Sequence, residues 1–92
     1  MELNVYSVLD LKTKAFTTPF YAKTRGEAIR SFTTAVNEGQ KDNMWHKYPE
    51  DFALYEIGTW DDNLGQFSMK DSKDNLGLAI QFKRIEDENS TH

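Results

Sequence analysis

The sequence predicts an α+β domain in which a mostly antiparallel sheet of four to five strands carries one amphipathic helix packed on one face. Two observations lead to this fold class. Segments rich in β-branched and aromatic residues at 3–9, 15–23, 51–60 and 66–70 are separated by polar turns, as expected of strands. Residues 24–39 instead repeat apolar residues at the spacing of a helix. The predicted order is therefore ββαββ, and the last element is a further strand or a short helix.

The first two strands are predicted to pair as a hairpin around a polar loop at 10–14. In the first of them, Tyr6 and Val8 lie on one face, and the other face carries Leu3, Val5, Ser7 and Leu9. The return strand at 15–23 contains Pro19, which has no backbone N–H to donate to a neighbour. This strand should therefore lie at an edge of the sheet or carry a bulge.

The helix has a recognisable beginning and end. Thr24 and Glu27 have the spacing of a capping box, in which each side chain accepts a hydrogen bond from a free backbone N–H of the first turn. Gly39 suits the left-handed conformation that ends many helices. Between them, one apolar stripe is formed by Ala28, Ile29, Phe32, Ala35 and Val36.

The second half of the chain begins with residues 38–49, which follow no clean period. In 51–60 both faces of the strand are apolar, which is typical of a strand buried on both sides or hidden by a partner. The alternation places Phe52, Leu54, Glu56 and Trp60 on one side, and Ala53, Tyr55, Ile57 and Thr59 on the other. Exposed rings left on the sheet face away from the helix would favour a binding function.

Turn residues at 61–65 precede the strand at 66–70, and 71–75 is predicted to be a loop. Residues 76–85 suit either a strand or a helix, and their alternation favours a strand. A single domain is predicted over residues 1–85, followed by a charged tail at 86–92.

The composition favours a soluble intracellular protein. The chain of 92 residues has a net charge of −4 and no cysteine, which fits a reducing compartment. No apolar run approaches the roughly 20 residues that cross a bilayer, and the N-terminus lacks the basic region of a signal peptide. We therefore expect no association with a membrane.

Four blocks of the sequence together carry a family resemblance. They are "NVYSVLDLKTKAF", "GEAIRSFTTAVN", "HKYPEDFALYEIGTWDDNLGQF" and "LGLAIQF". In this order, from about residue 4 to residue 83, they resemble the small non-structural protein of gokushovirus-type microviruses, which are single-stranded DNA bacteriophages. The resemblance implies a DNA-binding or DNA-synthesis protein that acts in the host bacterial cytoplasm. Such a protein would act at the switch from double-stranded replication to single-stranded genome synthesis and packaging.

Catalysis is not expected from these residues. The chain has two histidines, His46 and His92, and no phosphate-binding glycine loop or Ser/His/Asp spacing. Asp61 and Asp62 are adjacent carboxylates that could hold a metal, but within an Asp-Asp-Asn-Leu-Gly segment they are typical turn formers. The sequence therefore predicts no enzyme activity, no cofactor and no metal site.

Basic side chains form the first candidate site, for DNA phosphates. Residues 11–30 carry five basic residues against one acidic residue, a net charge of +4, whereas 49–92 carry four against ten, a net charge of −6. A globally acidic chain can bind a polyanion only through a local basic face. The candidates for phosphate contacts are Lys12, Lys14, Lys23, Arg25, Arg30, Lys41 and Lys47. The alternative is an ordinary solvated surface of mixed charge.

Aromatic side chains form the second candidate site, for bases. Stacking a base on a ring contributes roughly 1–3 kcal/mol and tolerates any sequence. The candidates are Tyr21, Trp45 and Tyr48, although Trp45 or Tyr48 could instead tuck under its loop and close one end of the core. With the basic residues they predict a non-enzymatic protein that binds single-stranded DNA, the phage genome, and regulates its synthesis or packaging.

A protein partner is the alternative. Tyr6 and Tyr55, with Tyr21, are candidates for an open sheet face that would form the seam of an oligomer. The opposite charges of the two halves of the chain suit self-assembly, or docking onto a viral replication or capsid-assembly protein without direct DNA binding. The two hypotheses are compatible, because many single-strand binders assemble along their strand.

Overall fold

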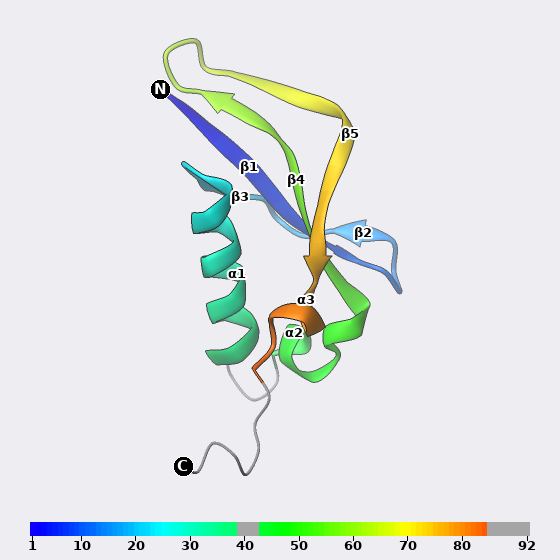
Figure 1. Ribbon diagram of the computed structural model, residues 1–92. Coiled ribbons are helices and arrows are strands. Elements are labelled where there is room, and N and C mark those ends of the chain that lie inside the picture. The colour runs from blue at the N-terminus through cyan, green and yellow to red at the C-terminus, as the bar shows by residue number, and fades with distance from the viewer. Residues whose placement is uncertain (39–42, 85–92) are drawn as a thin grey trace.

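The computed structural model describes residues 1–38 and 43–84, and it confirms the α+β fold. Its strands are β1 (Glu2–Asp10), β2 (Ala15–Phe16), β3 (Phe20–Ala22), β4 (Phe52–Asp61) and β5 (Gln66–Leu78). Its helices are α1 (Arg25–Glu38), α2 (Met44–Lys47) and α3 (Ala79–Phe82), with a short 3₁₀ turn, η1 (Pro49–Asp51), before β4. Figure 1 shows α1 lying along the sheet, with α2 and α3 beside its C-terminal end.

The strands form one antiparallel sheet of five strands with β1 and β4 in the middle. The predicted return strand is split in two: β2 pairs with the end of β1, and β3 pairs with an earlier part of it. Pro19 lies between the two halves, at the edge of the sheet, as predicted for a residue with no N–H to donate. Thr17 bridges the gap, because its N–H donates to the Val8 carbonyl at 2.9 Å and its own carbonyl accepts from the Ser7 hydroxyl at 2.7 Å.

Helix α1 begins directly after Thr24, as predicted. The Thr24 hydroxyl accepts a hydrogen bond from the Glu27 N–H at 3.1 Å. The Glu27 carboxylate accepts from the N–H of Lys23, one residue earlier than a regular capping box requires. Gly39, the predicted end of the helix, lies outside the described residues.

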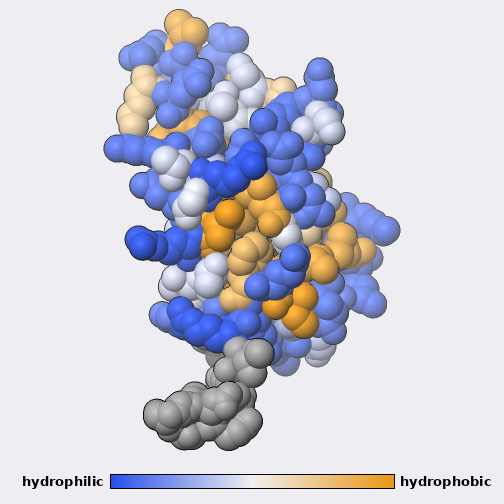
Figure 2. Space-filling model, viewed as in Figure 1, coloured by the Kyte–Doolittle hydropathy of each residue, from blue (hydrophilic) through white to orange (hydrophobic). Residues whose placement is uncertain are grey.

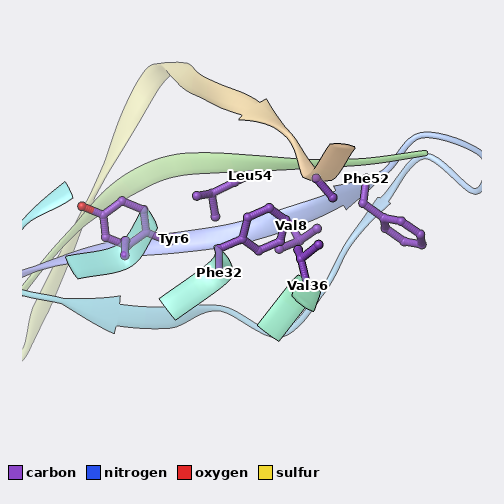
Figure 3. Close-up of a cluster of buried hydrophobic side chains, with 8 residues drawn as sticks. Tyr6, Val8, Phe32, Val36, Phe52 and Leu54 are labelled. Atoms are coloured by element: carbon purple, nitrogen blue, oxygen red, sulfur yellow. The ribbon is translucent and has the colours of Figure 1, made fainter. Parts of the chain in front are cut away.

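The core lies between α1 and the face of the sheet that carries Tyr6, Val8 and Leu54. In Figure 3, Phe32 of α1 points toward Val8 and Leu54 of the sheet. The other members of this buried cluster are Ala28, Val36, Phe52 and Ala79. The core is therefore a single layer between one sheet face and α1, closed at one end by α2 and α3.

Tyr6 belongs to this core, so the prediction that it lies on an open interface is wrong. Its exposed fraction is 0%. The ring stacks on Phe20 with 5.6 Å between centroids, and the hydroxyl accepts a hydrogen bond from the Asn4 side chain at 3.1 Å. Burial raises the pKa of the Tyr6 hydroxyl. The face that Tyr6 shares with Val8 is the one that α1 covers.

A β-bulge in β4 changes which residues share a face. Tyr6 pairs with Glu56 but Val5 pairs with Gly58, so Ile57 is an extra residue. After the bulge, Trp60 pairs with Leu3, on the face away from α1. The predicted placement of Trp60 on the same side as Phe52 and Leu54 is therefore wrong.

The rest of the second half also differs from expectation. Residues 71–75, predicted to be a loop, lie within β5, where the pairing with β4 is interrupted between Met69 and Asp74. Figure 1 shows β5 bending at its middle. The segment at 76–85 contains the end of β5 and then helix α3, so it is neither all strand nor all helix. Among the described residues, no helix is long and apolar enough to cross a membrane.

Candidate nucleic-acid interface

The sheet face away from α1 carries a row of aromatic side chains, and we call it the ring face. Strand pairing defines it, because Leu3 pairs with Trp60 and Ser7 pairs with Tyr55, whereas the alternating residues Tyr6 and Val8 point to α1. Its members are Leu3, Phe16, Tyr21, Tyr55, Trp60, Phe67 and Met69. Phe16, Tyr21 and Phe67 are 41%, 44% and 49% exposed. The ring face is therefore an aromatic surface in contact with solvent.

One end of the ring face combines rings with lysines, and we call it the hairpin cluster. Phe16 of β2 and Tyr55 of β4 meet edge to face, with 5.6 Å between their centroids. The Lys73 ammonium, at the bend of β5, lies 5.9 Å from the centroid of Phe16. Exposed Lys12 and Lys14, in the turn directly before β2, complete the cluster.

The turn between β1 and β2 is held in shape by Asp10. The Asp10 carboxylate accepts a hydrogen bond from the backbone N–H of Lys12 at 2.9 Å, and the Asp10 carbonyl accepts one from the N–H of Lys14 at 2.7 Å. Lys14 has a φ of 65°, the left-handed conformation that closes the turn. The two lysines are thus presented to solvent by an ordered backbone.

The other end of the ring face forms a shallow apolar cleft of about 270 Å³, which we call the ring cleft. It is lined by Leu3, Tyr21, Trp60 and Phe67. The rings of Trp60 and Phe67 are tilted against each other with 4.7 Å between centroids. Carboxylates follow Trp60 directly in the chain, at Asp61 and Asp62. Hence one end of the ring face is basic and the other lies beside acidic residues.

The pattern of a known protein family covers most of this fold. Residues 3–82 match the family described as "Phage ORF5 protein". The chain belongs to this family. It is 33% identical over 69 residues to "Protein ORF5" of Chlamydia phage 1, which covers 73% of this chain and 72% of that protein. No solved structure matches.

The family confirms the resemblance to the small non-structural proteins of gokushovirus-type microviruses. This ORF5-family chain is thus a phage non-structural protein. The five-stranded sheet with α1 on one face is the fold of the matched region, since residues 3–82 include every described strand apart from Glu2.

The predicted phosphate contacts of this ORF5-family protein do not form one patch. Lys12 and Lys14 lie at the turn after β1, whereas Lys23, Arg25 and Arg30 lie at the start of α1, near the other end of β1 (Figure 1). Lys47 is exposed in α2, with its ammonium 5.7 Å from the ring of Tyr48. Lys41 lies outside the described residues.

Arg25 is engaged in ion pairs within the chain. Its Nε donates to Glu56 at 3.0 Å and its Nη2 donates to Asp74 at 3.0 Å. Lys70 lies 3.5 Å from Glu56 and 3.3 Å from Asp74, so two cations and two carboxylates form a closed cluster. Because these charges offset each other, Arg25 has little charge left to offer to a phosphate.

Glu56 is the buried member of this ion-pair cluster, with 8% of the residue exposed. Burial alone would raise the pKa of the Glu56 carboxyl, but the hydrogen bond and the charge of Arg25, together with Lys70, outweigh it and hold the pKa below its usual value of 4.5. The folded state therefore favours the charged carboxylate. A group of this kind contributes stability above its unfolded pKa, and that stability is lost as the pH falls through the folded pKa.

We expect Glu56→Gln to lower the free energy of unfolding by about 1 kcal/mol at pH 7, because the cations that pair with Glu56 are partly exposed. The loss should shrink as the pH falls below about 4.5, since protonation removes the same charge from the native protein. Urea unfolding at several pH values measures both quantities. Glu50→Gln removes an exposed carboxylate and serves as the control. An equal loss at pH 3 and pH 7 would show that the charge of Glu56 does not stabilise the fold.

The predicted stacking residues occupy different environments. Tyr21 lines the ring cleft and Tyr48 is 44% exposed beside Lys47, so each has an accessible ring. Trp45 is half-buried and packs on Phe32, with 5.2 Å between centroids. This contact supports the alternative that Trp45 closes one end of the core.

Trp45 also borders an apolar groove beside α1, of about 220 Å³, with Phe20, Ser31 and Ala35 on its other walls. Figure 2 shows hydrophobic side chains gathered in the middle of the molecule next to α1, with hydrophilic side chains around them.

Five members of the ring face were not among the residues expected to bind: Leu3, Phe16, Trp60, Phe67 and Met69. Lys73, which lies beside Phe16, was not among them either. Phe67 stands between the polar residues Gln66 and Ser68, and that alternation could have placed it on one face of the sheet. No local signal points to Lys73, because its position depends on the bend of β5. Within 1–38 and 43–84, no group of three or more His, Cys, Asp or Glu side chains is arranged to hold a metal ion.

Proposed function

We propose that this ORF5-family protein is a non-enzymatic binder of single-stranded DNA that regulates synthesis or packaging of the phage genome in the host bacterial cytoplasm. The observation that carries the proposal is the hairpin cluster, where the exposed ring of Phe16 packs on the half-buried Tyr55 beside Lys12, Lys14 and Lys73. A ring platform next to cations is the arrangement that single-strand binders use.

Single-stranded DNA fits this site better than duplex DNA. In a duplex the faces of the bases are stacked on one another, so only a single strand can offer a base to the ring of Phe16. The three lysines can contact phosphates on both sides of that base. The net charge of −4 opposes binding of DNA elsewhere on the protein, so the contact should be confined to this local site.

Binding of this kind suits a regulatory role. A protein that covers newly made single strands withdraws them from copying into duplex and keeps them available for packaging. Base stacking on rings tolerates any sequence, so the whole genome could be covered. Catalytic chemistry is not needed for such a role.

The proposal is tested by fluorescence anisotropy with labelled oligo-dT and a matched duplex at several salt concentrations. We expect the wild-type protein to prefer the single strand. Lys12→Gln/Lys14→Gln/Lys73→Gln should weaken binding by about tenfold or more and make the salt slope shallower by about 2, because each lost single-strand phosphate contact removes about 0.7. Phe16→Ala should weaken binding by about 1–3 kcal/mol and leave the slope unchanged.

The matched control changes the net charge equally at other sites: Lys23→Gln/Arg30→Gln/Lys47→Gln. We expect this variant to bind oligo-dT within about twofold of the wild type, because these residues lie away from the hairpin cluster. A larger loss in the control than in the hairpin variant would move the DNA site to the start of α1. Absence of binding by the wild type at tens of micromolar would refute direct DNA binding.

A second candidate function is docking onto a viral replication or capsid-assembly protein. It is favoured by the exposed apolar side chains near the ring cleft, since Phe67 and Met69 are 49% and 55% exposed. A protein that fails to bind oligo-dT but captures such a partner through this region would support the second candidate.

A further inference from the structure

The ring cleft is built for a different ligand from the hairpin cluster. Three of its four walls are aromatic rings, from Tyr21, Trp60 and Phe67. The faces of such rings are electron-rich and attract cations. On the same face, the alternation along β4 places Asp62 two residues after Trp60, beside the cleft, with its side chain about half exposed.

The chemistry of the cleft therefore selects a cation with an apolar stem. A lysine or arginine side chain can lay its methylene groups on Leu3 and the rings while its charged end reaches Asp62. The amino terminus of Met1 already pairs with Asp62 at 2.8 Å, which shows that a cation is accommodated at this edge. A cleft of about 270 Å³ holds one or two side chains rather than a folded domain.

The chain itself presents a ligand of this chemistry in the turn after β1. Leu11 is 36% exposed there, and the neighbouring Lys12 and Lys14 are also exposed. Asp10 holds the turn in one conformation, so docking would cost little conformational entropy. The turn thus offers an apolar residue and two ammonium groups to a cleft with apolar walls and one neighbouring carboxylate, Asp62.

The turn and the cleft lie at opposite ends of β1. The cleft contains Leu3, near the start of the strand, and the turn follows Asp10 at its end. At about 3.3 Å per residue, the strand separates them by about 25 Å. Figure 1 shows the N-terminus and the turn between β1 and β2 at opposite ends of β1. One copy cannot place its own turn in its own cleft.

We propose that the turn at Leu11–Lys14 of one copy docks into the ring cleft of a second copy, and that repetition of this contact builds an open head-to-tail chain. The contact is heterologous, because it joins two different surfaces of identical subunits. It is also small, so assembly is weak and depends on protein concentration.

This contact goes beyond DNA binding and can be tested without DNA. Sedimentation velocity over a range of concentrations measures the weight-average mass of the wild type and two variants. Lys12→Glu/Lys14→Glu reverses the charge of the turn and keeps the cleft. Tyr21→Ala/Phe67→Ala opens the cleft and keeps the turn. We expect the mass of the wild type to rise with concentration and each variant to remain at the monomer mass.

Mixing the two variants is the decisive step. The mixture contains one intact cleft and one intact turn, so it can form a single contact and stop. We expect the mixture, and neither variant alone, to reach twice the monomer mass and no more. A mixture that stays monomeric while the wild type assembles would overturn the head-to-tail arrangement. A wild type that stays monomeric at high micromolar concentration would overturn self-assembly.

Two controls guard against indirect effects. Arg30→Glu/Lys47→Glu makes the same change of charge away from the turn, and Ile80→Ala shortens an apolar side chain that is 49% exposed elsewhere. Both should assemble as the wild type does, and circular dichroism checks that every variant is folded. If either control abolished assembly, the specific contact would be refuted.

A last measurement adds oligo-dT to the wild type. Because Lys12 and Lys14 serve both proposals, bound DNA should lower the mass of the protein assemblies.

The added-DNA measurement rests on the proposed function, and the mixing experiment does not. Loss of DNA binding together with successful mixing would refute the DNA proposal and keep the head-to-tail contact. Salt-sensitive DNA binding by a protein that never assembles would support the DNA proposal and refute the head-to-tail contact.

Discussion

Phe32→Ala is expected to lower the free energy of unfolding by about 3–5 kcal/mol, the range for removal of a buried aromatic ring. Phe32 is 1% exposed and stands at the centre of the core. Its ring contacts Trp45 at 5.2 Å and Phe82 at 5.8 Å between centroids. The substitution would therefore open a cavity where α1 meets α2, α3 and the sheet. Domains of this size are stable by about 5–15 kcal/mol, so the substitution would remove a large part of the stability.

Urea unfolding followed by circular dichroism measures this loss. Phe67→Ala is the matched control, because it removes the same atoms from a ring that is 49% exposed. The control should lose about 1 kcal/mol or less, from its contact with Trp60. Equal losses in the two variants would mean that Phe32 is not the centre of the core.

Gly58→Val is expected to lower the free energy of unfolding by about 3 kcal/mol, at the upper end of the usual cost of overpacking. A Cβ at this position would lie 2.6 Å from the Ser68 carbonyl oxygen and 3.0 Å from the Met69 Cα. Both neighbours are backbone atoms of β5, so the two strands would have to separate. Gly58 follows the extra residue of the β4 bulge and pairs with Met69 of β5.

The control for this prediction is Gly26→Ala. In the first turn of α1, a Cβ on Gly26 would have only the Thr24 hydroxyl within 4 Å, at 3.9 Å. Alanine also suits a helix better than glycine, so we expect no loss of stability. Both variants are compared by thermal and urea unfolding. If Gly58→Val were as stable as the wild type, the close approach of β4 and β5 would be incorrect.

The elements with strong local signals could be predicted from the sequence. Thr24 and Glu27 marked the start of α1, and the stripe through Ala28, Phe32 and Val36 is its buried face. Pro19 placed the return strand at an edge. In each case the deciding interaction lies within a few residues, where spacing along the chain reports geometry directly.

Features that depend on pairing between distant segments could not be predicted in this way. The alternation in β4 was read as unbroken, and the bulge at Ile57 became visible only through the register with Val5 and Tyr6. The same applies to Tyr6, which was expected on an open face because nothing local shows which side α1 covers.

In the candidate site too, local sequence predicts some features, and others depend on residues far along the chain. The sequence places Lys12 and Lys14 in a polar turn, and in the structure both are exposed in the turn between β1 and β2. Arg25 was also identified as a free cation, but Glu56 and Asp74, 31 and 49 residues later, neutralise it. Charge along a sequence therefore overstates the charge that reaches the surface.

The extra residue in β4 reverses the alternation of side chains between the two faces of the sheet. Up to Glu56 the even-numbered side chains face α1, and from Gly58 onward they face the other way. Losing one residue at Ile57 would exchange Trp60 with its neighbours in the ring cleft, although the composition of the strand would hardly change. The number of residues in β4 between Glu56 and Trp60 thus determines which positions of the strand face a partner at the ring cleft, whatever residue types occupy them.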